Sequence, residues 1–214
     1  EPERRQYVAC LEHMDDSIGQ IIDVINKLGQ KDNTLVIFFS DNGGTNGDDS
    51  SRYPNTKAKG KIKGLNTPLR GWKSQLYEGG IRVPAIAYWP GEIDPIKVKA
   101  LTHVTDWMPT ICGLIGYDEK HDLKWDGLDI WPLIKNKKEF ENKRILYCKG
   151  VNGTYAALHQ WPWKLIVGKG REELFDLSKD PNEKNDLAKK ERKIANSLKR
   201  LVDFEAVRDN DKLP

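Results

Sequence analysis

No apolar run in this sequence approaches the ~20 residues that a membrane-spanning helix needs, so no transmembrane segment is predicted. Cysteine is scarce as well: Cys10, Cys112 and Cys148 form no Cys-x-x-Cys metal spacing, and an odd number leaves at least one thiol unpaired. Disulfides are therefore not the expected source of stability. An excess of one charge is also lacking, since 35 basic residues face 32 acidic ones, so nucleic-acid binding is not predicted.

The chain also lacks an initiator methionine and a signal peptide. Residue 1 stands directly before a segment patterned as a helix, so we interpret the start as a cut in a longer sequence. The 214 residues are 38% apolar and 31% charged, which is ordinary globular composition. This length suffices for one large domain, or for one and a half.

The first half of the sequence has the pattern of an α/β unit. Residues 4–28 repeat apolar side chains at spacings of three and four, which predicts an amphipathic helix. The continuous apolar run 34–39 predicts a strand buried on both faces, as in a parallel sheet beneath helices. A second strand is predicted over 83–89 and a helix over 105–116. Helix, turn and buried strand in succession indicate an α/β fold.

The pattern changes after about residue 135. Short strands separated by Gly, Asn or Pro are predicted at 144–149, 155–159, 163–167 and 173–177. A final amphipathic helix is predicted over 185–202. We therefore expect an α/β region over 1–135, followed over 136–214 by a small antiparallel sheet with a packed helix.

The strand predicted over 34–39 leads into Ser-Asp-Asn-Gly-Gly at 40–44. In open α/β sheets, ligands bind at the carboxyl ends of strands. Asp41 supplies a carboxylate and Asn42 an amide carbonyl, and these hard oxygen donors suit Ca²⁺ or Mg²⁺. The alternative for this segment taken alone is a plain Asx turn after a strand.

A second polar segment, residues 69–84, is punctuated by glycine. Lys73 can clamp an oxyanion as a point charge, and Arg82 can bind one as a planar fork. For Arg82 the alternative is structural, an ion pair with Glu78 that braces the loop.

Two further side chains have open roles. Trp72 neighbours Lys73 and can stack on a sugar ring, although core packing is the default for tryptophan. His103 precedes the helix predicted over 105–116, where it either lines a substrate pocket or makes a structural hydrogen bond.

Together these segments resemble the sulfatase family of the alkaline-phosphatase-like superfamily. The likeness is collinear over nearly the whole chain and includes Ser-Asp-Asn-Gly-Gly at 40–44, Leu-Arg-Gly-Trp-Lys at 69–73, Leu-Tyr-Glu-Gly-Gly-Ile-Arg-Val-Pro at 76–84, His-Val-Thr-Asp-Trp at 103–107, Asp-Gly-Leu-Asp-Ile-Trp at 126–131 and Leu-Phe-Asp-Leu-Ser-Lys-Asp-Pro at 174–181. Within the family the spacing resembles arylsulfatase B (N-acetylgalactosamine-4-sulfatase) and its bacterial relatives. The resemblance implies the C-terminal part of a mixed-sheet α/β sandwich, plus a small antiparallel sheet.

The resemblance implies an enzyme, a sulfuric ester hydrolase acting on a sulfated carbohydrate or an aryl sulfate. Asp41 and Asn42 match the second pair of ligands to a calcium ion, expected in preference to magnesium. Lys73 matches the catalytic lysine that contacts the sulfate and its leaving oxygen. His103 and Trp72 are expected substrate contacts, as is Arg82 if it is not structural. Such enzymes are periplasmic, secreted or lysosomal.

One part of the family pattern is missing. Sulfatases use a formylglycine nucleophile made from the cysteine of Cys-x-Pro-Ser-Arg, and none of the three cysteines stands in that context. By the same resemblance, the first pair of carboxylate ligands, the catalytic His and a second catalytic Lys, distinct from Lys73, are expected in segments upstream of Glu1. Asp41 and Asn42 would give calcium only two of its usual roughly 6–8 oxygen ligands. We therefore expect the chain alone to be inactive, with the upstream part of the same sulfatase as its partner.

Two other functions remain open from the sequence. One is a phosphomonoester or phosphonate hydrolase of the same superfamily, which the missing nucleophile motif would distinguish. The other is a non-catalytic, calcium-stabilised relative that binds carbohydrate. A membrane and nucleic acid are not expected partners.

Overall fold

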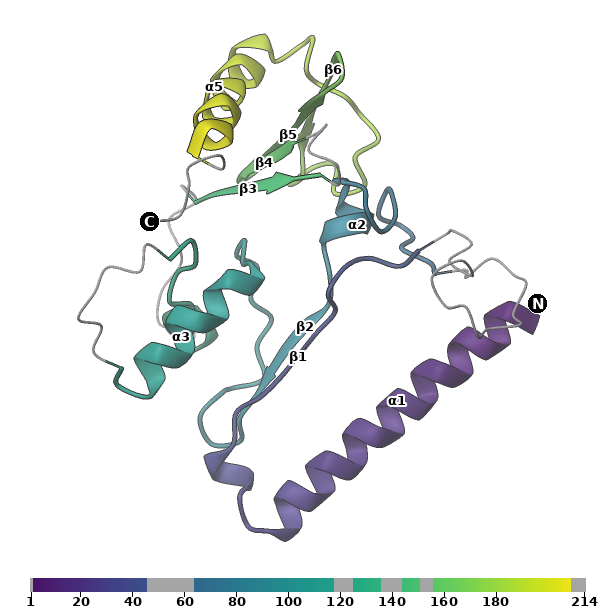
Figure 1. Cartoon of the computed structure of the whole chain (residues 1–214), viewed down its shortest axis with the longest axis vertical. Coiled ribbons are helices and arrows are strands. Elements are labelled where there is room, and N and C mark those ends of the chain that lie inside the picture. Colours follow the sequence, from purple (N-terminus) through teal and green to yellow (C-terminus); the bar gives the residue numbers. More distant parts are fainter. Residues whose placement is uncertain (1, 46–63, 118–124, 136–143, 151–155, 209–214) are drawn as a thin grey trace.

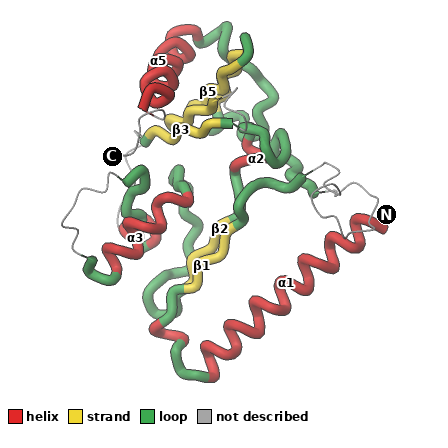
Figure 2. Tube along the Cα trace, viewed as in Figure 1, coloured by secondary structure: helices red, strands yellow, loops and turns green. Residues whose placement is uncertain are grey.

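The computed structural model describes residues 2–45, 64–117, 125–135, 144–150 and 156–208. A long N-terminal helix lies along one edge of the molecule, and a two-stranded ribbon runs beside it (Figure 1). A four-stranded sheet with the C-terminal helix lies at the opposite end (Figure 2).

Helix α1, Pro2–Lys27, confirms the helix predicted from the apolar repeat. Its apolar stripe, however, is not covered by other described residues: Ile21 is 60% exposed and Val24 53%. Across the described chain, no helix combines the length and the apolar character that crossing a bilayer requires. The stripe therefore presents an apolar face to its surroundings.

Strand β1, Val36–Phe39, pairs with β2, Ala85–Tyr88, and the two strands run antiparallel. The prediction that residues 34–39 form a strand buried on both faces of a parallel sheet is therefore wrong for the described chain. β1 is half-buried, and Phe39 is 41% exposed. A continuous apolar run shows that both faces suit burial, but it carries no information about the direction of the neighbouring strand.

Short helical segments connect the larger elements. They are η1 (Lys31–Asn33), α2 (Glu78–Ile81), η3 (Val104–Asp106), α3 (Trp107–Leu114) and α4 (Trp131–Ile134). Pro109 lies in the first turn of α3, where its missing N–H has no helical partner to lose. The buried side chains of α4 pack against Trp107 and form a small core of their own.

The antiparallel sheet predicted for the second half is confirmed. Its strands follow the chain in the order β3 (Ile145–Lys149), β4 (Ala156–Gln160), β5 (Trp163–Gly168) and β6 (Arg171–Asp176). Each strand pairs with the next as a hairpin.

Helix α5, Arg192–Arg208, begins seven residues later than the predicted helix over 185–202. The intervening segment is held to the sheet as a turn. The Asp186 carboxylate accepts hydrogen bonds from the backbone N–H groups of Leu174 and Ala188, and Leu187 N–H donates to the carbonyl of Leu174. Aspartate competes with the helix in this way by capturing nearby backbone donors.

The two faces of the four-stranded sheet have different cover. On one face Leu158, Leu165 and Leu174 are fully buried beneath α5. Burial of each such leucine contributes about 1.5–3 kcal/mol. On the other face the buried cluster that includes Phe175 packs against Tyr77, which lies in the loop before α2. The loop that carries Lys73 therefore packs against this second face of the sheet.

The domain boundary expected between residues 135 and 136 stays a prediction. Contacts cross this boundary, among them the ion pairs of Arg144 with Asp106 and of Lys164 with Glu78.

Candidate functional site

The loop after β1 brings the two predicted metal ligands together. Asp41 is exposed and Asn42 is half-buried. The Asn42 side-chain amide and its backbone N–H both donate to Asp41 Oδ1, at 3.1 Å and 2.9 Å. Ser40 Oγ donates to the carbonyl of Asn42 at 3.0 Å and closes the turn. These bonds do not form the Asx turn, because the Gly43 N–H, two residues after Asp41, donates to Gly80 instead. They nevertheless hold both oxygen-bearing side chains at one point.

The loop that carries Lys73 docks on this turn through backbone hydrogen bonds. Lys73 N–H donates to the carbonyl of Gly44 at 3.1 Å. Gly43 N–H donates to the carbonyl of Gly80 at 2.9 Å. Residues 41–44 and 70–80, which are predicted to bind the same anion, therefore lie against each other.

The side chain of Asn66 clamps the same junction. Its Oδ1 accepts from Gly44 N–H at 2.8 Å, while its Nδ2 donates to the carbonyls of Gly44 and Gly71 at 2.9 and 3.0 Å. One amide thus satisfies backbone groups of both loops, and such groups are costly to leave unpaired when buried.

Close approach explains the glycines at the junction. A Cβ added to Gly43 would lie 1.8 Å from the carbonyl oxygen of Gly79. A Cβ on Gly80 would lie 2.1 Å from the carbonyl oxygen of Gln75 and 2.5 Å from that of Trp72. Real Cβ atoms do not approach so closely, so any side chain here would force the loops apart.

Two of the predicted substrate contacts have structural partners. Arg82 lies 3.7 Å from Glu78 Oε2 with its side chain 59% exposed, which is the bracing ion pair expected as its alternative role. Trp72 is half-buried, and its N–H and C=O both bond to Gln75 within a tight turn. Contact of either side chain with substrate stays a prediction.

His103 caps the 3₁₀ turn η3. Its backbone N–H donates to Asp106 Oδ2 at 2.7 Å, and its Nδ1 lies 3.0 Å from Thr105 Oγ1. Burial lowers the pKa of the His103 imidazole and favours the neutral ring. The structural hydrogen bond is therefore present, and a pocket-lining role stays a prediction.

A buried ion triad was not predicted from the sequence. The side chain of Lys164 is fully buried in β5, and its Nζ lies 3.0 Å from Glu78 Oε1 and 2.7 Å from Glu183 Oε1. The available signal was a lysine within the apolar strand 163–167. A strand buried on both faces can hold such a charge only if the charge is paired.

His159 lies beside the triad on β4. Its Nε2 is 3.7 Å from Glu78 Oε1, beyond hydrogen-bond distance. Burial lowers the pKa of His159 to about 3, and the adjacent Lys164 ammonium acts in the same direction. The ring is therefore neutral at physiological pH.

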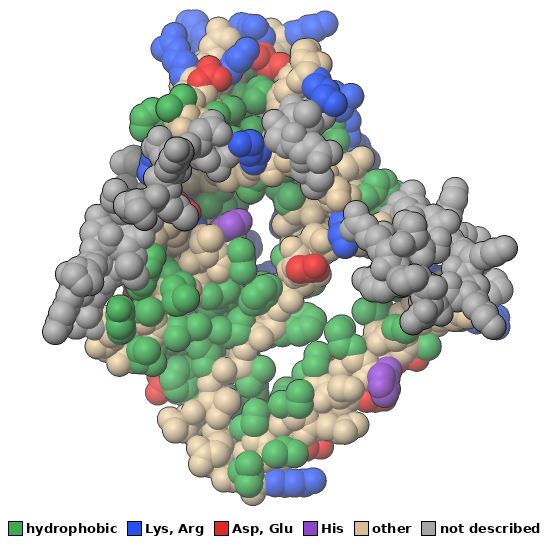
Figure 3. All heavy atoms as spheres, in the orientation of Figure 1, with side chains coloured by type: hydrophobic (Ala, Val, Ile, Leu, Met, Phe, Trp, Pro, Cys, Tyr) green, Lys and Arg blue, Asp and Glu red, His purple; other side chains and the backbone are tan. Residues whose placement is uncertain are grey.

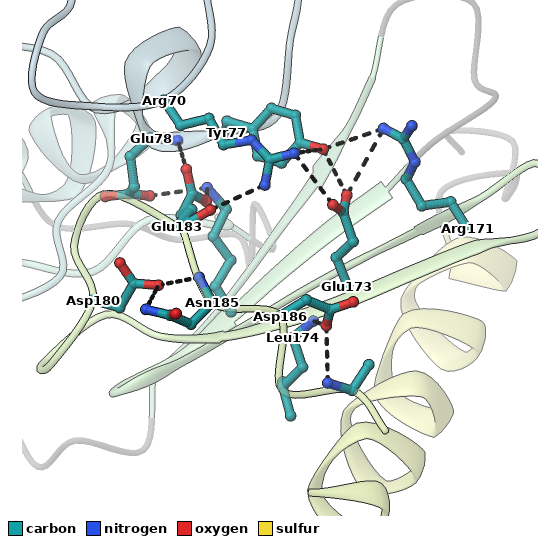
Figure 4. Close-up of polar contacts among 12 residues, drawn as sticks. Arg70, Tyr77, Glu78, Arg171, Glu173, Leu174, Asp180, Glu183, Asn185 and Asp186 are labelled. Carbon is teal, nitrogen blue, oxygen red and sulfur yellow. Dashed lines mark hydrogen bonds and ion pairs between the residues drawn. The ribbon is translucent and has the colours of Figure 1, made fainter. Parts of the chain in front are cut away.

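A second contact ties the Lys73 loop to the sheet. Arg70, Tyr77 and Glu173 point toward one another (Figure 4), and the Arg70 guanidinium carbon lies 3.9 Å from the Tyr77 ring centroid. Tyr77 Oη donates to Glu173 Oε2 at 2.6 Å, and Arg70 Nη1 donates to the carbonyl of Glu183 at 3.0 Å. Burial and the Glu173 carboxylate together raise the pKa of Tyr77, so it stays a hydrogen-bond donor.

The donor chemistry of Asp41 and Asn42 fits one part of a calcium site. One carboxylate and one amide carbonyl are hard oxygen ligands, on a partly exposed turn that a cation can reach. No group of three or more His, Cys, Asp or Glu side chains that could hold a metal occurs among the residues the structure describes. The remaining ligands would have to come from elsewhere.

Comparison with known proteins agrees with this geometry. The model of the Sulfatase family matches residues 1–117, and that of the N-sulphoglucosamine sulphohydrolase C-terminal family matches residues 71–207. The first match alone covers more than half of the chain. The chain therefore belongs to the sulfatase family, and its fold is the mixed α/β fold of that family.

Individual relatives carry several different names. The chain is 31% identical to mouse arylsulfatase J over 184 residues, which is 77% of this chain and 28% of that protein. It is 28% identical to N-acetylgalactosamine-6-O-sulfatase of Bacteroides thetaiotaomicron over 208 residues, or 89% of this chain and 40% of that protein. The crystal structure of Ps i-CgsB with k-i-k-neocarrahexaose superposes with a TM-score of 0.82 at 26% identity, covering 95% of this chain and 43% of that one. This chain thus spans less than half the length of each relative, and the arylsulfatase B likeness stays a prediction.

Proposed function

We propose that this chain contributes Lys73, Asp41 and Asn42 to the active site of a sulfatase that hydrolyses a sulfate ester. The hydrogen bond from Lys73 N–H to the Gly44 carbonyl carries the proposal, because it joins the two motif-bearing loops at the end of β1. Membership of the family supports the reaction class. The roles of the three residues follow from their positions in the family motifs.

The chemistry of Lys73 is electrostatic. When the sulfur–oxygen bond breaks, negative charge develops on the leaving ester oxygen. Lys73 is a half-buried residue, and at such a position attraction to that oxygen is screened less than in bulk water. Preorganised charges of this kind lower a barrier without reorganising during the reaction.

Asp41 and Asn42 would hold one side of the calcium ion. A bound calcium ion supplies fixed positive charge next to the sulfate oxygens. The Asn42-to-Asp41 hydrogen bonds orient both side chains before a cation arrives. The formylglycine nucleophile belongs, in this proposal, to the upstream portion of the enzyme.

The proposed packing surface for the upstream portion is supported by exposed apolar faces. They comprise Leu11, Met14, Ile21 and Val24 on α1, Phe39, Ile86 and Tyr88 on the ribbon, Met108 and Ile111 on α3, and Ile115 directly after α3. Hydrophobic side chains gather along these elements in the space-filling view (Figure 3). Exposed large apolar side chains gathered on several elements are typical of an interaction site. The proposed occupant is the rest of the large α/β domain, because relatives are more than twice as long.

A sulfated carbohydrate is the favoured substrate class. The name of the Bacteroides relative specifies an amino-sugar sulfate, and Ps i-CgsB was solved with a carrahexaose. Trp72 and His103 are the candidate sugar contacts on this chain. The family further favours a periplasmic, secreted or lysosomal location.

The test compares full-length protein with its Lys73→Ala variant on a chromogenic aryl sulfate, a sulfated disaccharide and p-nitrophenyl phosphate. We expect sulfate hydrolysis, and a loss of about 10²–10³-fold in kcat for Lys73→Ala, as for removal of one oxyanion donor. Lys97→Ala, an exposed lysine, is the control and should leave the rate unchanged. Equal rates for Lys73→Ala and the parent would refute the role of Lys73. Hydrolysis of phosphate alone would favour a phosphatase.

A second experiment tests the division of the site. The 214-residue chain alone should show no hydrolysis, and adding the separately expressed upstream portion should restore it. Substituting Ile21→Asp on the exposed face of α1 should prevent this restoration, because a buried unpaired carboxylate is costly. Restoration at the parent level in Ile21→Asp would contradict the proposed packing face.

A further inference from the structure

The ammonium of Lys164 is the one positive charge between two buried carboxylates in the described part of the chain. Its side chain is 0% exposed, as is that of Glu183, and that of Glu78 is 5% exposed. Moving charges out of water costs several kcal/mol per ion unless their mutual geometry is good. The Lys164 ammonium donates a hydrogen bond to Glu78 Oε1 at 3.0 Å and forms an ion pair with Glu183 Oε1 at 2.7 Å.

Glu183 also holds the start of α2. Its Oε2 accepts a hydrogen bond from the backbone N–H of Glu78 at 2.7 Å, the first helical position of α2. Burial raises the pKa of Glu183, and the Lys164 ammonium opposes that shift. The exposed Arg82 guanidinium, 3.7 Å from Glu78, is too solvated to replace a buried ammonium.

Helix α2 also hydrogen-bonds both loops of the candidate site, the one after β1 and the one that carries Lys73. The carbonyl of Gly80 accepts from Gly43 N–H at 2.9 Å, directly after the metal pair. Gly79 N–H donates to the carbonyl of Arg70 at 2.6 Å, within the loop that carries Lys73. A shift of α2 would therefore be passed to both loops, since neither glycine leaves space for an adjustment.

We propose that Lys164 is a positioning residue: by pairing with both Glu78 and Glu183, it fixes α2 and thereby the separation of Lys73 from the Asp41–Asn42 turn. The catalytic consequence rests on the proposed function, whereas the positioning itself does not. This proposal assigns a role to the small C-terminal sheet. It supplies, from β5, the charge that locks the sulfate-facing loops.

Removing the ammonium would leave two carboxylates facing each other in a buried site. Either one carboxylate takes up a proton or α2 moves away from the sheet. The other titratable groups that face the pair are His159 on β4 and Cys148 on β3, and neither carries a positive charge at neutral pH. Acidic pH, which protonates a carboxylate, would therefore relieve the defect.

The first test needs no enzyme activity and uses the 214-residue chain. Amide exchange is followed by NMR for Glu78, Gly43 and Lys73, whose N–H groups make the contacts described above, in Lys164→Met and in the control Lys179→Met. Lys179 lies in the same part of the chain with its side chain 84% exposed. We expect exchange at the three amides to accelerate at least about tenfold in Lys164→Met, because an unpaired buried charge destabilises its surroundings, and not in Lys179→Met.

The double variant Lys164→Met with Glu78→Gln separates charge from packing. It removes the repulsion between two carboxylates, while Glu183 keeps its hydrogen bond from the backbone N–H at position 78, so we expect the amide protection of Gly43 and Lys73 to return in part. Equal exchange in Lys164→Met and Lys179→Met would overturn the proposal. If Lys164→Met fails to fold, recovery of the fold in the double variant supports the proposal, and a double variant that also stays unfolded overturns it.

The second test uses the full-length enzyme. At pH 7, Lys164→Met should lower kcat about tenfold or more with KM within about threefold, since the loss falls on transition-state contacts. As the pH is lowered toward 5, the ratio of the kcat of Lys164→Met to that of the parent should rise toward one. A ratio independent of pH would overturn the charge argument. An inactive parent would refute the proposed function, and amide exchange would still decide the positioning role.

Discussion

The backbone amide of Lys73 donates a hydrogen bond to the carbonyl oxygen of Gly44 over 3.1 Å. Two segments that lie 29 positions apart in the chain are thereby held at one end of the β1–β2 ribbon. The sequence motifs required such convergence, because the Asp41–Asn42 pair and the Lys73 ammonium are expected to act on one anion. The backbone hydrogen bond between the two loops meets this requirement.

Asp41→Ala should weaken calcium binding by the full-length protein at least about 100-fold, since it removes a charged ligand from a site built of oxygen donors. Isothermal titration with Ca²⁺ measures the change. Asp94→Ala, an exposed carboxylate after β2, is the matched control and should bind as the parent does. Tight calcium binding retained in Asp41→Ala would remove this residue from the ligand set.

Gly43→Ala should destabilise the chain by about 1–3 kcal/mol, because its Cβ would meet the Gly79 carbonyl oxygen at 1.8 Å. Gly19→Ala in α1 is the control, since no atom lies within 4 Å of its added Cβ, and it should be neutral or stabilising by up to about 1 kcal/mol. Urea unfolding of both variants measures the difference. A Gly43→Ala chain as stable as the parent would show that the two loops do not pack as described.

Arg144→Met should cost about 3–5 kcal/mol, because it leaves the fully buried Asp106 carboxylate without its cation. Arg144 Nη1 lies 2.6 Å from Asp106 Oδ2. Arg208→Met breaks an exposed pair with Glu205 on α5 and should change stability by less than about 1 kcal/mol. Denaturant unfolding of the two variants provides the comparison, and similar losses in both would contradict the assigned burial.

His159 should make the chain acid-sensitive. Its pKa is about 3 when folded and about 6.5 when unfolded, so between these values the unfolded state alone binds a proton. The free energy of unfolding therefore falls as pH drops from about 6.5, by up to ~1.4 kcal/mol per pH unit. His159→Leu should lose this contribution to the slope, and the exposed His13→Leu should keep it. The measurement is urea unfolding from pH 7.5 to 4.5, and identical slopes in His159→Leu and the parent would be the contrary result.

Much of the local structure was predictable, because periodicity is a property of neighbouring residues. The apolar repeat over 4–28 gave the helix α1, and the short apolar segments after residue 143 gave the four hairpin strands. The final helix begins later than its apolar repeat predicts. The repeat around Leu187 has helical spacing, but the Asp186 carboxylate accepts hydrogen bonds from backbone N–H groups of the sheet and of the turn. A competing hydrogen bond of this kind has no periodic signature.

Some residues of the candidate site could be predicted from the sequence and others could not. Asp41, Asn42 and Lys73 were identified from motif spacing, because their chemistry and order along the chain are visible in sequence. Lys164 and Glu183 were not identified from the sequence. Lys164 on β5 hydrogen-bonds Glu78 on α2, which lies 86 positions away in the chain. This contact depends on tertiary packing, which the sequence pattern does not contain.

The sequence by itself determined the elements, the family and the two loops that carry the chemistry, since each depends on residues close together in the chain. Only the tertiary structure decided that β1 and β2 run antiparallel, that Arg82 braces Glu78, and that one of 35 basic side chains is buried between two carboxylates. The reason is physical: burial and charge pairing depend on which surfaces meet. Composition and spacing leave that choice open.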